Sequence, residues 1–281
     1  MSVLKSPFQR RTRFAGQYLV LILFTLLALF PVVLVFMTSF KARRAIFNSP
    51  LQIPMPETFS LKGYDTVFTR SAYFLFFKNS LVVTLVSLAC ILLFGAMAAW
   101  ALSEYKFKGN KMLGLYLALG IMIPIRLGTV AILRLVVSLK LVNTLTALIL
   151  VYTAMGLPMT IFIMQQFMEQ IPRGLKDAGR IDGADEYRIF SLILPMVRPA
   201  LGTVAVFTMM PIWNDLWFPL ILAPAKKTQT LILGAQQFLG QYITDWNAVL
   251  AALSMAVLPV IVLYVAFSKQ LVRGLTAGAI K

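Results

Sequence analysis

Residues 169–195 read Glu169-Gln-Ile-Pro-Arg-Gly-Leu-Lys-Asp-Ala-Gly-Arg-Ile-Asp-Gly-Ala-Asp-Glu-Tyr-Arg-Ile-Phe-Ser-Leu-Ile-Leu-Pro195, an island of charge in an otherwise apolar chain. Half of the ten acidic residues of the 281-residue protein lie here: Glu169, Asp177, Asp182, Asp185 and Glu186. The apolar chain on both sides is interrupted at this point by a long polar segment. We therefore predict that the stretch lies outside the apolar body of the protein.

The same stretch has the signals of two short helices. Pro172 can begin a helix, because the first helical position needs no N–H donor. Apolar residues then recur at helical spacing, at Leu175, Ala178 and Ile181. Glycine tolerates positive φ, so Gly183 can end this helix in a turn, and a second helix is predicted over residues 185–194, ending at Pro195. The result is a helix–turn–helix whose apolar stripe needs a partner.

Long uncharged runs decide the class of protein. The chain is 59% hydrophobic, and a membrane-spanning helix needs about 20 apolar residues. Runs near this length predict six spans, at residues 14–40, 79–103, 112–133, 141–168, 199–225 and 246–268. We expect a kink or re-entrant piece near Pro124 and Arg126, and a break in the fourth span at Gly156-Leu-Pro158. The sequence thus predicts an all-α polytopic membrane protein with six transmembrane helices.

Several kinds of chemistry have no support in the composition. There is no histidine, the single cysteine is Cys90, and no Gly-x-x-x-x-Gly-Lys-Ser/Thr phosphate loop occurs. We therefore predict no catalytic residue, no metal site, no cofactor in this chain and no ATP hydrolysis by it. The net charge of +16 would suggest nucleic acid in a soluble protein. Here the basic residues are scattered through loops, so membrane topology explains them better and no nucleic acid is expected.

The basic residues also indicate an orientation. Residues 1–15 carry Lys5, Arg10, Arg11 and Arg13 and no acid. They precede an apolar run too long for a signal peptide, which predicts a retained first span with a cytoplasmic amino terminus. With six spans, 15 of the 26 Lys and Arg residues lie inside and 11 outside. This bias favours the orientation only mildly.

The charged stretch resembles a known family. Asp177-Ala178-Gly179, then Gly183, then Ile193-Leu194-Pro195 are similar to the "EAA" cytoplasmic loop of importer-type ABC transporter permeases, which reads Glu-Ala-Ala, a Gly, then Ile-x-Leu-Pro. In that family the loop docks into a groove on the ATPase subunit and carries its motion to the membrane helices. The resemblance assigns ATPase coupling to Asp177, Ala178, Gly179, Asp182, Gly183, Ala184, Leu194 and Pro195. The alternative is an ordinary amphipathic loop between two spans.

A second group of candidate residues lies in the fifth predicted span. Aromatic faces and polar side chains together suit a sugar ring, whose CH groups stack while its hydroxyls form hydrogen bonds. The substrate-path candidates are therefore Trp213, Asn214, Asp215 and Trp217. A charge within a span is costly and usually faces a cavity or a partner. Trp-Asn-Asp here resembles the carbohydrate branch of the family, whereas the alternative is an interfacial aromatic belt.

The carboxyl-terminal tail resembles that of maltose-type permeases. In that type the tail enters the interface between the two ATPase subunits, which assigns this role to Gly274, Leu275, Thr276, Ala277 and Gly278. The alternative is a frayed basic terminus.

Together the resemblances imply one permease domain over residues 1–281, with the MetI-like fold of type I importers, a coupling loop at 169–198 and a cytoplasmic tail at 269–281. They imply import of a sugar, oligosaccharide or related polyol across a bacterial inner membrane, with both termini cytoplasmic. The implied partners are a second homologous permease, an ATPase dimer that binds ATP and Mg, a periplasmic or extracellular solute-binding protein, and the lipid bilayer.

Two other functions stay open. An ABC importer permease for a non-sugar solute would share the coupling loop. An ion-coupled secondary transporter would carry intramembrane acids or histidines and internal repeats. Neither repeats nor histidines are visible, and only Asp215 is a candidate acid within a span. An enzyme is the least supported class, because no nucleophile–base pair is visible.

Overall fold

The computed structural model describes residues 7–240 and 244–277, which are mostly helical. In chain order the α-helices are α1 (Pro7–Ser39), α2 (Arg43–Asn48), α3 (Lys62–Arg70), α4 (Tyr73–Glu104), α5 (Asn110–Met122), α6 (Thr129–Ser138), α7 (Leu145–Glu169), α8 (Arg173–Ile181), α9 (Glu186–Ile193), α10 (Arg198–Trp213), α11 (Trp217–Leu222), α12 (Leu231–Ala235) and α13 (Trp246–Ala277). Two short 3₁₀ helices are η1 (Ile125–Gly128) and η2 (Gln236–Phe238). Within the described ranges, extended pairing is limited to two isolated bridges, Lys41 with Phe59 and Leu239 with Thr244.

The chain forms two compact units. The first comprises Met1–Ser71 and Ala235–Met255, and the second comprises Ala72–Gly234 and Ala256–Lys281. Helix α13 contributes residues to both.

Buried polar groups hold the first unit together. Lys41 is buried, and its Nζ donates hydrogen bonds to the carbonyls of Ser49 at 2.9 Å and Pro50 at 2.8 Å. The backbone carbonyl of Lys41 in turn accepts a hydrogen bond from Asn247 Nδ2 at 2.6 Å. A buried charge is costly unless it is paired or hydrogen-bonded, and here two carbonyl dipoles accept from the ammonium group.

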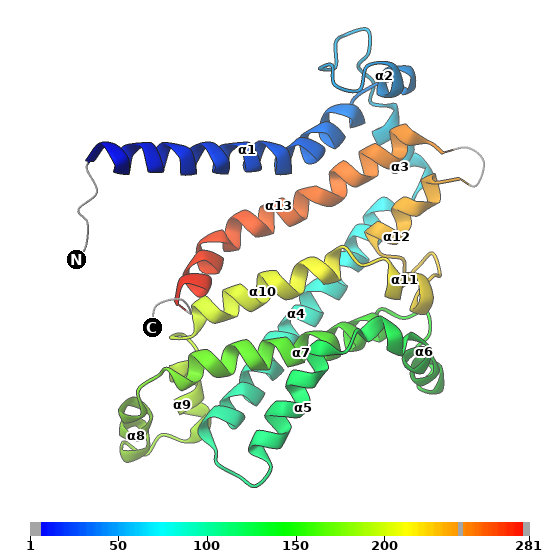
Figure 1. Cartoon of the computed structure of the whole chain (residues 1–281). Helices are drawn as coiled ribbons and strands as arrows, with labels where there is room; N and C mark the ends of the chain where they lie inside the picture. The colour runs from blue at the N-terminus through cyan, green and yellow to red at the C-terminus, as the bar shows by residue number, and fades with distance from the viewer. Residues whose placement is uncertain (1–6, 241–243, 278–281) are drawn as a thin grey trace. The chain divides into compact units, whose positions relative to one another are not determined.

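Close packing of α4 against α7 organises the second unit (Figure 1). A Cβ added to Gly156 of α7 would lie 2.5 Å from Cδ1 of the buried Ile91 on α4. A Cβ added to Gly95 of α4 would likewise overlap the side chain of Thr160 on α7. Small residues let two helix backbones approach closely, as is common in membrane proteins. Figure 1 shows α8 and α9 at one end of this helix layer and α6 and α11 at the other.

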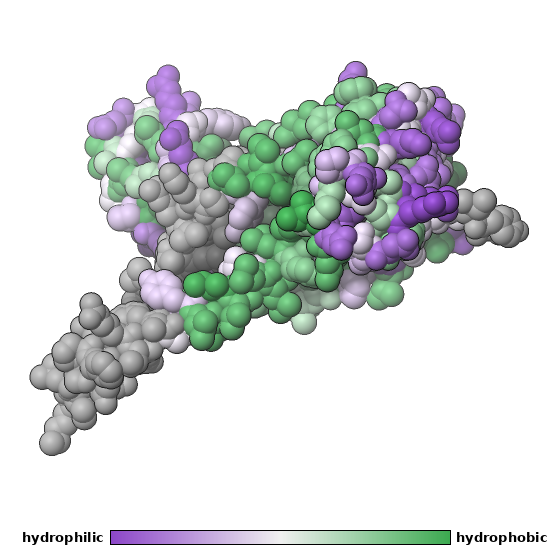
Figure 2. All heavy atoms as spheres, turned by 90° about the horizontal axis from the view of Figure 1, so that it is seen from above, coloured by the Kyte–Doolittle hydropathy of each residue, from purple (hydrophilic) through white to green (hydrophobic). Residues whose placement is uncertain are grey.

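The membrane-spanning segments only partly match the six predicted ones. Three helical stretches are long and apolar enough to cross a membrane, Gly16–Ser39, Tyr73–Glu104 and Leu145–Glu169, and two bent pairs bring the total to five if each pair is one span. In the described residues, the apolar part of the last helix is the shorter stretch Trp246–Val262. The count of six is therefore not established. Hydrophobic residues cover much of the surface seen in Figure 2, as expected for contact with lipid.

Two expectations about broken spans have opposite outcomes. The kink near Pro124 is confirmed, because α5 ends at Met122 and lies at 89° to the helical segment that begins at Ile125. The fifth predicted span, residues 199–225, is not one continuous helix, since α10 stops at Trp213. The break at Gly156-Leu-Pro158 is wrong, because α7 continues through Pro158. Packing against α4 on both sides of the proline keeps the helix continuous despite one missing backbone hydrogen bond.

We predict that Gly156→Ala destabilises the protein by about 1–3 kcal/mol, because the added methyl group overpacks a contact with a buried isoleucine. Thermal unfolding of the purified protein in detergent measures this change. Gly114→Ala is the matched control, since an added Cβ there meets nothing within 4 Å and alanine favours helix. Equal unfolding temperatures for the two variants would contradict the close-packing argument.

Candidate functional sites: the charged loop and the Asp215 cavity

The helix–turn–helix predicted for the charged loop, residues 169–198, is confirmed. Helix α8 ends at Ile181, and Gly183 has a φ of 77°, which is the left-handed region that glycine adopts without strain. Asp185 then caps α9, because its Oδ1 accepts a hydrogen bond from the backbone N–H of Arg188 at 2.7 Å. The turn at Gly183 and the cap at Asp185 together set the angle between α8 and α9.

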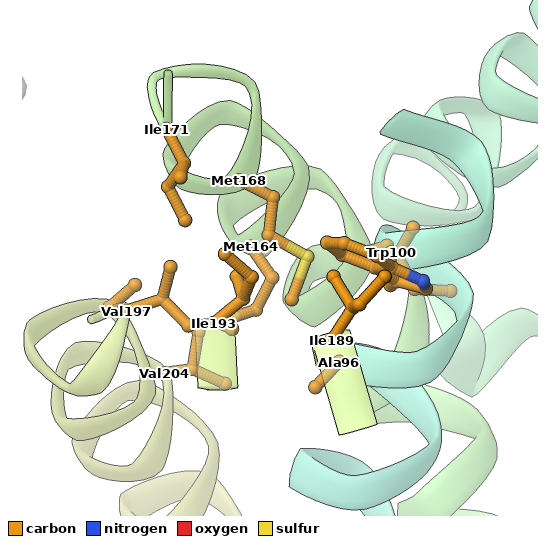
Figure 3. Packing of buried hydrophobic residues seen from close by; sticks show 12 residues of the cluster. Ala96, Trp100, Met164, Met168, Ile171, Ile189, Ile193, Val197 and Val204 are labelled. Atoms are coloured by element: carbon orange, nitrogen blue, oxygen red, sulfur yellow. The ribbon is translucent and has the colours of Figure 1, made fainter. Parts of the chain in front are cut away.

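The apolar side of the charged loop packs on the ends of three long helices. Ile189 and Ile193 of α9 are buried together with Val197, which precedes α10, and with residues of α4, α7 and α10, among them Ala96, Trp100, Met164, Met168 and Val204. Figure 3 shows these side chains pointing toward one another. The ring of Trp100 also meets the ring of Phe190 edge to face, with centroids 6.0 Å apart. The predicted apolar stripe was on the wrong helix, because Leu175, Ala178 and Ile181 of α8 are exposed and the buried isoleucines belong to α9.

The opposite side of the loop remains exposed. Ile181 is 85% exposed and Tyr187 is 78% exposed, although both are large and apolar. The residues assigned to coupling lie here or at the margin: Asp177, Ala178, Asp182, Gly183 and Pro195 are exposed, whereas Gly179, Ala184 and Leu194 are half-buried. These exposed side chains are therefore accessible to another protein.

A buried ion pair ties α8 to the end of α4. Lys176 is buried, and its Nζ donates to Glu104 Oε2 at 2.8 Å while lying 5.1 Å from the ring centroid of Trp100. Arg180, one turn further along α8, donates from Nη2 to the other oxygen of Glu104 at 2.5 Å. One carboxylate thus holds two basic residues of the same helix. Removing one partner of such a pair leaves a charge without compensation, which is costly.

Arg180 extends this network across the loop. Its Nε donates to Glu186 Oε1 at 3.0 Å and its Nη1 to Asp177 Oδ1 at 3.2 Å. The hydroxyl of Tyr105 donates to Glu186 Oε2 at 2.8 Å. Hydrogen bonds to Glu186 and Glu104 raise the pKa of Arg180 further above its usual value, so this network stays charged.

Asp177 is also part of this network. The resemblance assigns this carboxylate to ATPase coupling, but within this chain it already pairs with Arg180 and is still 60% exposed. Glu104 and Lys176 were missed altogether. Glu104 is the one acid between residues 66 and 168, which was a signal, but nothing in the sequence connects it with a residue 72 positions later.

At the far end of the helix layer, Asp215 lies in the turn between α10 and α11. Its Oδ1 accepts a hydrogen bond from the backbone N–H of Trp217 at 3.2 Å, and its Oδ2 accepts from that of Phe218 at 3.1 Å. The hydroxyl of Tyr152 donates to Oδ2 at 2.8 Å, and Arg126 Nη2 lies 3.9 Å from Oδ1. Asp215 therefore caps α11 and attaches it to α7.

These residues border a cavity of about 620 Å³, the Asp215 cavity. It is lined by Arg126, Tyr152, Met155, Pro211, Ile212, Asn214, Asp215, Leu216, Trp217, Phe218 and Leu220. Three of the four predicted substrate-path residues, Asn214, Asp215 and Trp217, are thus brought together. Trp213 is not among them, which corrects the sequence-based grouping. It is buried and its Nε1 donates to the carbonyl of Ala256 at 3.1 Å, because one residue along a helix turns a side chain by about 100°.

The predicted tail is described only in part. Helix α13 continues past residue 268 and includes Gly274, Leu275, Thr276 and Ala277 in its backbone, whereas Gly278 lies outside the described residues. Its role at an ATPase interface stays a prediction. Within the described ranges, no group of three or more His, Cys, Asp and Glu residues could hold a metal ion.

Comparisons with known proteins agree with this architecture. Residues 91–277 match the family described as "Binding-protein-dependent transport system inner membrane component". The chain is 31% identical to the arabinooligosaccharides transport system permease protein AraQ of Halalkalibacterium halodurans, over 91% of this chain and 92% of that protein. It is 30% identical to the diacetylchitobiose uptake system permease protein NgcG of Streptomyces coelicolor, over 96% of this chain and 90% of that protein.

A solved structure has the same fold. One chain of a bacterial ABC transporter involved in the import of the acidic polysaccharide alginate superposes with a TM-score of 0.78 at 21% identity, covering 95% of this chain and 99% of that one.

The chain therefore belongs to the family of binding-protein-dependent transport system inner membrane components. It has the MetI-like permease fold and is a multi-pass inner-membrane protein. It is a permease component of an ABC importer, a transport subunit rather than an ATPase. Membership in this family implies partnership with an ATPase and a solute-binding protein.

We predict that Glu104→Gln loosens α8 by about 1–3 kcal/mol, because the buried Lys176 loses its anionic partner. Hydrogen–deuterium exchange of residues 173–193 in the purified protein is expected to become faster. Glu169→Gln is the matched control, because Glu169 is exposed and its side chain accepts only from Gln165 among the described residues. Unchanged exchange in Glu104→Gln would show that the ion pair does not hold the loop.

Proposed function

We propose that this chain is one of two permease subunits of an ABC importer for a sugar, oligosaccharide or related polyol. The observation that carries the proposal is full-length similarity to permeases named for oligosaccharide uptake, such as the arabinooligosaccharide and diacetylchitobiose proteins. The Asp215 cavity supports it, because Trp217 offers an aromatic face and Asn214 an exposed amide to a hydroxylated ring. Pockets of about 300–1,000 Å³ are usual for small-molecule ligands.

In this proposal the charged loop docks on the ATPase subunit. The exposed Ile181 and Tyr187 provide apolar anchors, and the exposed Asp177 and Asp182 provide polar contacts beside them. ATP-driven closure of the ATPase dimer then moves α8. The pair between Lys176 and Glu104 carries that movement to α4, and the packing of α9 carries it to α7 and α10.

The orientation follows from the same assignment. If the charged loop meets the ATPase, it lies on the cytoplasmic side together with both termini, and the Asp215 cavity opens toward the outer side. The carboxyl-terminal tail would then reach the ATPase interface. A soluble binding protein would deliver substrate to the outer side, and the second permease would complete the path.

The test of this function is reconstitution. The chain is to be purified together with its second permease and ATPase, inserted into liposomes and supplied with its binding protein. We expect ATP-dependent accumulation of an oligosaccharide and substrate-stimulated ATP turnover, whereas this chain alone should turn over no ATP above empty liposomes. Accumulation of amino acids or phosphate but of no saccharide would overturn the sugar assignment.

A separate prediction concerns coupling through Gly183. Gly183→Val should strongly reduce uptake and substrate-stimulated ATP turnover, because a β-branched residue at this φ costs about 1–3 kcal/mol and distorts the turn between α8 and α9. Gly174→Val is the control, since Gly174 is exposed, lies in α8 and has open space around it. Insertion of both variants into membranes should be normal.

Variants of Asp177 refine this test. Asp177→Ala should weaken co-purification of the ATPase, while Asp177→Glu, which restores the residue found in the "EAA" pattern, should be tolerated. If Gly183→Val supports normal uptake and normal ATPase co-purification, the charged loop is not the coupling element.

A further inference from the structure

The polar groups that line the Asp215 cavity offer a ligand more hydrogen-bond donors than acceptors. Asp215 is its one acid, and its side chain is only 10% exposed. Both carboxylate oxygens already accept hydrogen bonds, from Tyr152 and from the backbone of Trp217 and Phe218. This carboxylate is therefore occupied by the protein and has little capacity left for the hydroxyl groups of a ligand.

The other polar side chains divide into occupied and available ones. The Tyr152 hydroxyl donates to Asp215, and Trp217 Nε1 donates to Thr129 Oγ1 at 3.0 Å. Arg126 is different: its side chain is 68% exposed and donates no hydrogen bond to any described residue. Its contacts are Asp215 Oδ1 at 3.9 Å and the ring of Trp217, whose centroid lies 5.8 Å from the guanidinium carbon.

These two contacts orient the Arg126 guanidinium without using its donors. A guanidinium carries five N–H donors in a fixed planar fork, and that fork matches the two oxygens of a carboxylate. The exposed Asn214 adds an amide whose Nδ2 donates to the Met210 carbonyl at 3.1 Å, leaving its oxygen available. The available groups are thus many donors and one amide acceptor, a set that suits an acceptor-rich ligand.

The outer segments of the second unit, to which the cavity belongs, carry a positive charge like that of Arg126. In the proposed orientation these segments hold six basic residues and one acid, Asp215. Such an excess attracts anions, and the attraction weakens as salt increases. A neutral saccharide would gain nothing from this field.

We propose that the Asp215 cavity is a binding subsite for one acidic sugar residue, with the sugar carboxylate on the Arg126 guanidinium. The exposed face of Trp217 stacks on the ring, and the Asn214 oxygen accepts from a ring hydroxyl. Asp215 is a positioning residue, because it holds Tyr152, α11 and the guanidinium in place without touching the ligand. This inference rests on the proposed function and narrows its substrate class to saccharides that contain uronic acid.

The test compares matched substrates in the reconstituted complex. The probes are trimers of galacturonic, guluronic and mannuronic acid, and the same trimers with each carboxyl group reduced to an alcohol. We expect the complex to accumulate at least one acidic trimer in preference to its reduced form. Arg126→Gln should lower accumulation of that acidic trimer by about tenfold or more, and so lower the ratio of acidic to reduced uptake.

Two further variants serve as controls. Arg126→Lys keeps the charge but loses the planar fork, and should give an intermediate ratio. Arg134→Gln removes a basic residue of α6 that is exposed and does not line the cavity, and should leave the ratio of acidic to reduced uptake close to that of the unaltered complex. Co-purification of all subunits with each variant confirms that the complex has assembled.

The outcomes separate this inference from the function on which it rests. Accumulation of the reduced trimers alone, or an unchanged ratio in Arg126→Gln, overturns the acidic subsite and leaves a sugar importer. An equal fall of acidic and reduced uptake in Arg126→Gln also overturns it, since a structural or lipid-binding role of Arg126 affects both substrates alike. Accumulation of no saccharide, while another class of solute is carried, contradicts the proposed function and the subsite together.

Discussion

The close approach of α4 and α7 is the constraint on which the rest of the second unit depends. Glycines at positions 95 and 156 leave room for the side chains of Thr160 and Ile91 on the facing helix, which brings the two helices close together. Both candidate sites are built on the ends of this pair. Trp100 and Glu104 lie at the end of α4 and receive the charged loop, and Tyr152 of α7 anchors Asp215 at the other end. In a bilayer, where helices gain little from hydrophobic burial, such contact at short range is a main source of specificity.

The acids of this chain are few, and the structure uses several of them internally. Glu104 binds two basic residues of α8, Glu186 binds Arg180 and Tyr105, and Asp215 caps α11 while holding Tyr152. Each of these carboxylates joins segments that are distant in sequence. An excess of basic residues means that each acid can be paired, whereas many basic residues stay available for lipid, partner or ligand. Arg126 is the clearest example, because its neighbours orient it without occupying its donors.

One side of the charged loop is packed on the rest of the protein, and the other side is exposed. Its inner side is held by Ile189 and Ile193 in a buried cluster and by the pair of Lys176 with Glu104. Its outer side presents Ile181 and Tyr187, which would be unfavourable on a surface that always faces water. Because its inner side is packed on α4, α7 and α10, we propose that the loop moves together with these helices and passes a displacement from a bound partner to the membrane.

The sequence by itself determined the all-α membrane class, the two short helices of the charged loop, the turn at Gly183 and the kink near Pro124. These features depend on apolar run length, on backbone freedom at glycine and on the missing N–H of proline, all of which are local properties. Tertiary structure alone decided that α7 passes through Pro158, that Trp213 is buried beside Ala256, and that Glu104 and Lys176 meet. Those outcomes depend on which side of one helix faces another, and residues 72 positions apart carry no local signal of their contact.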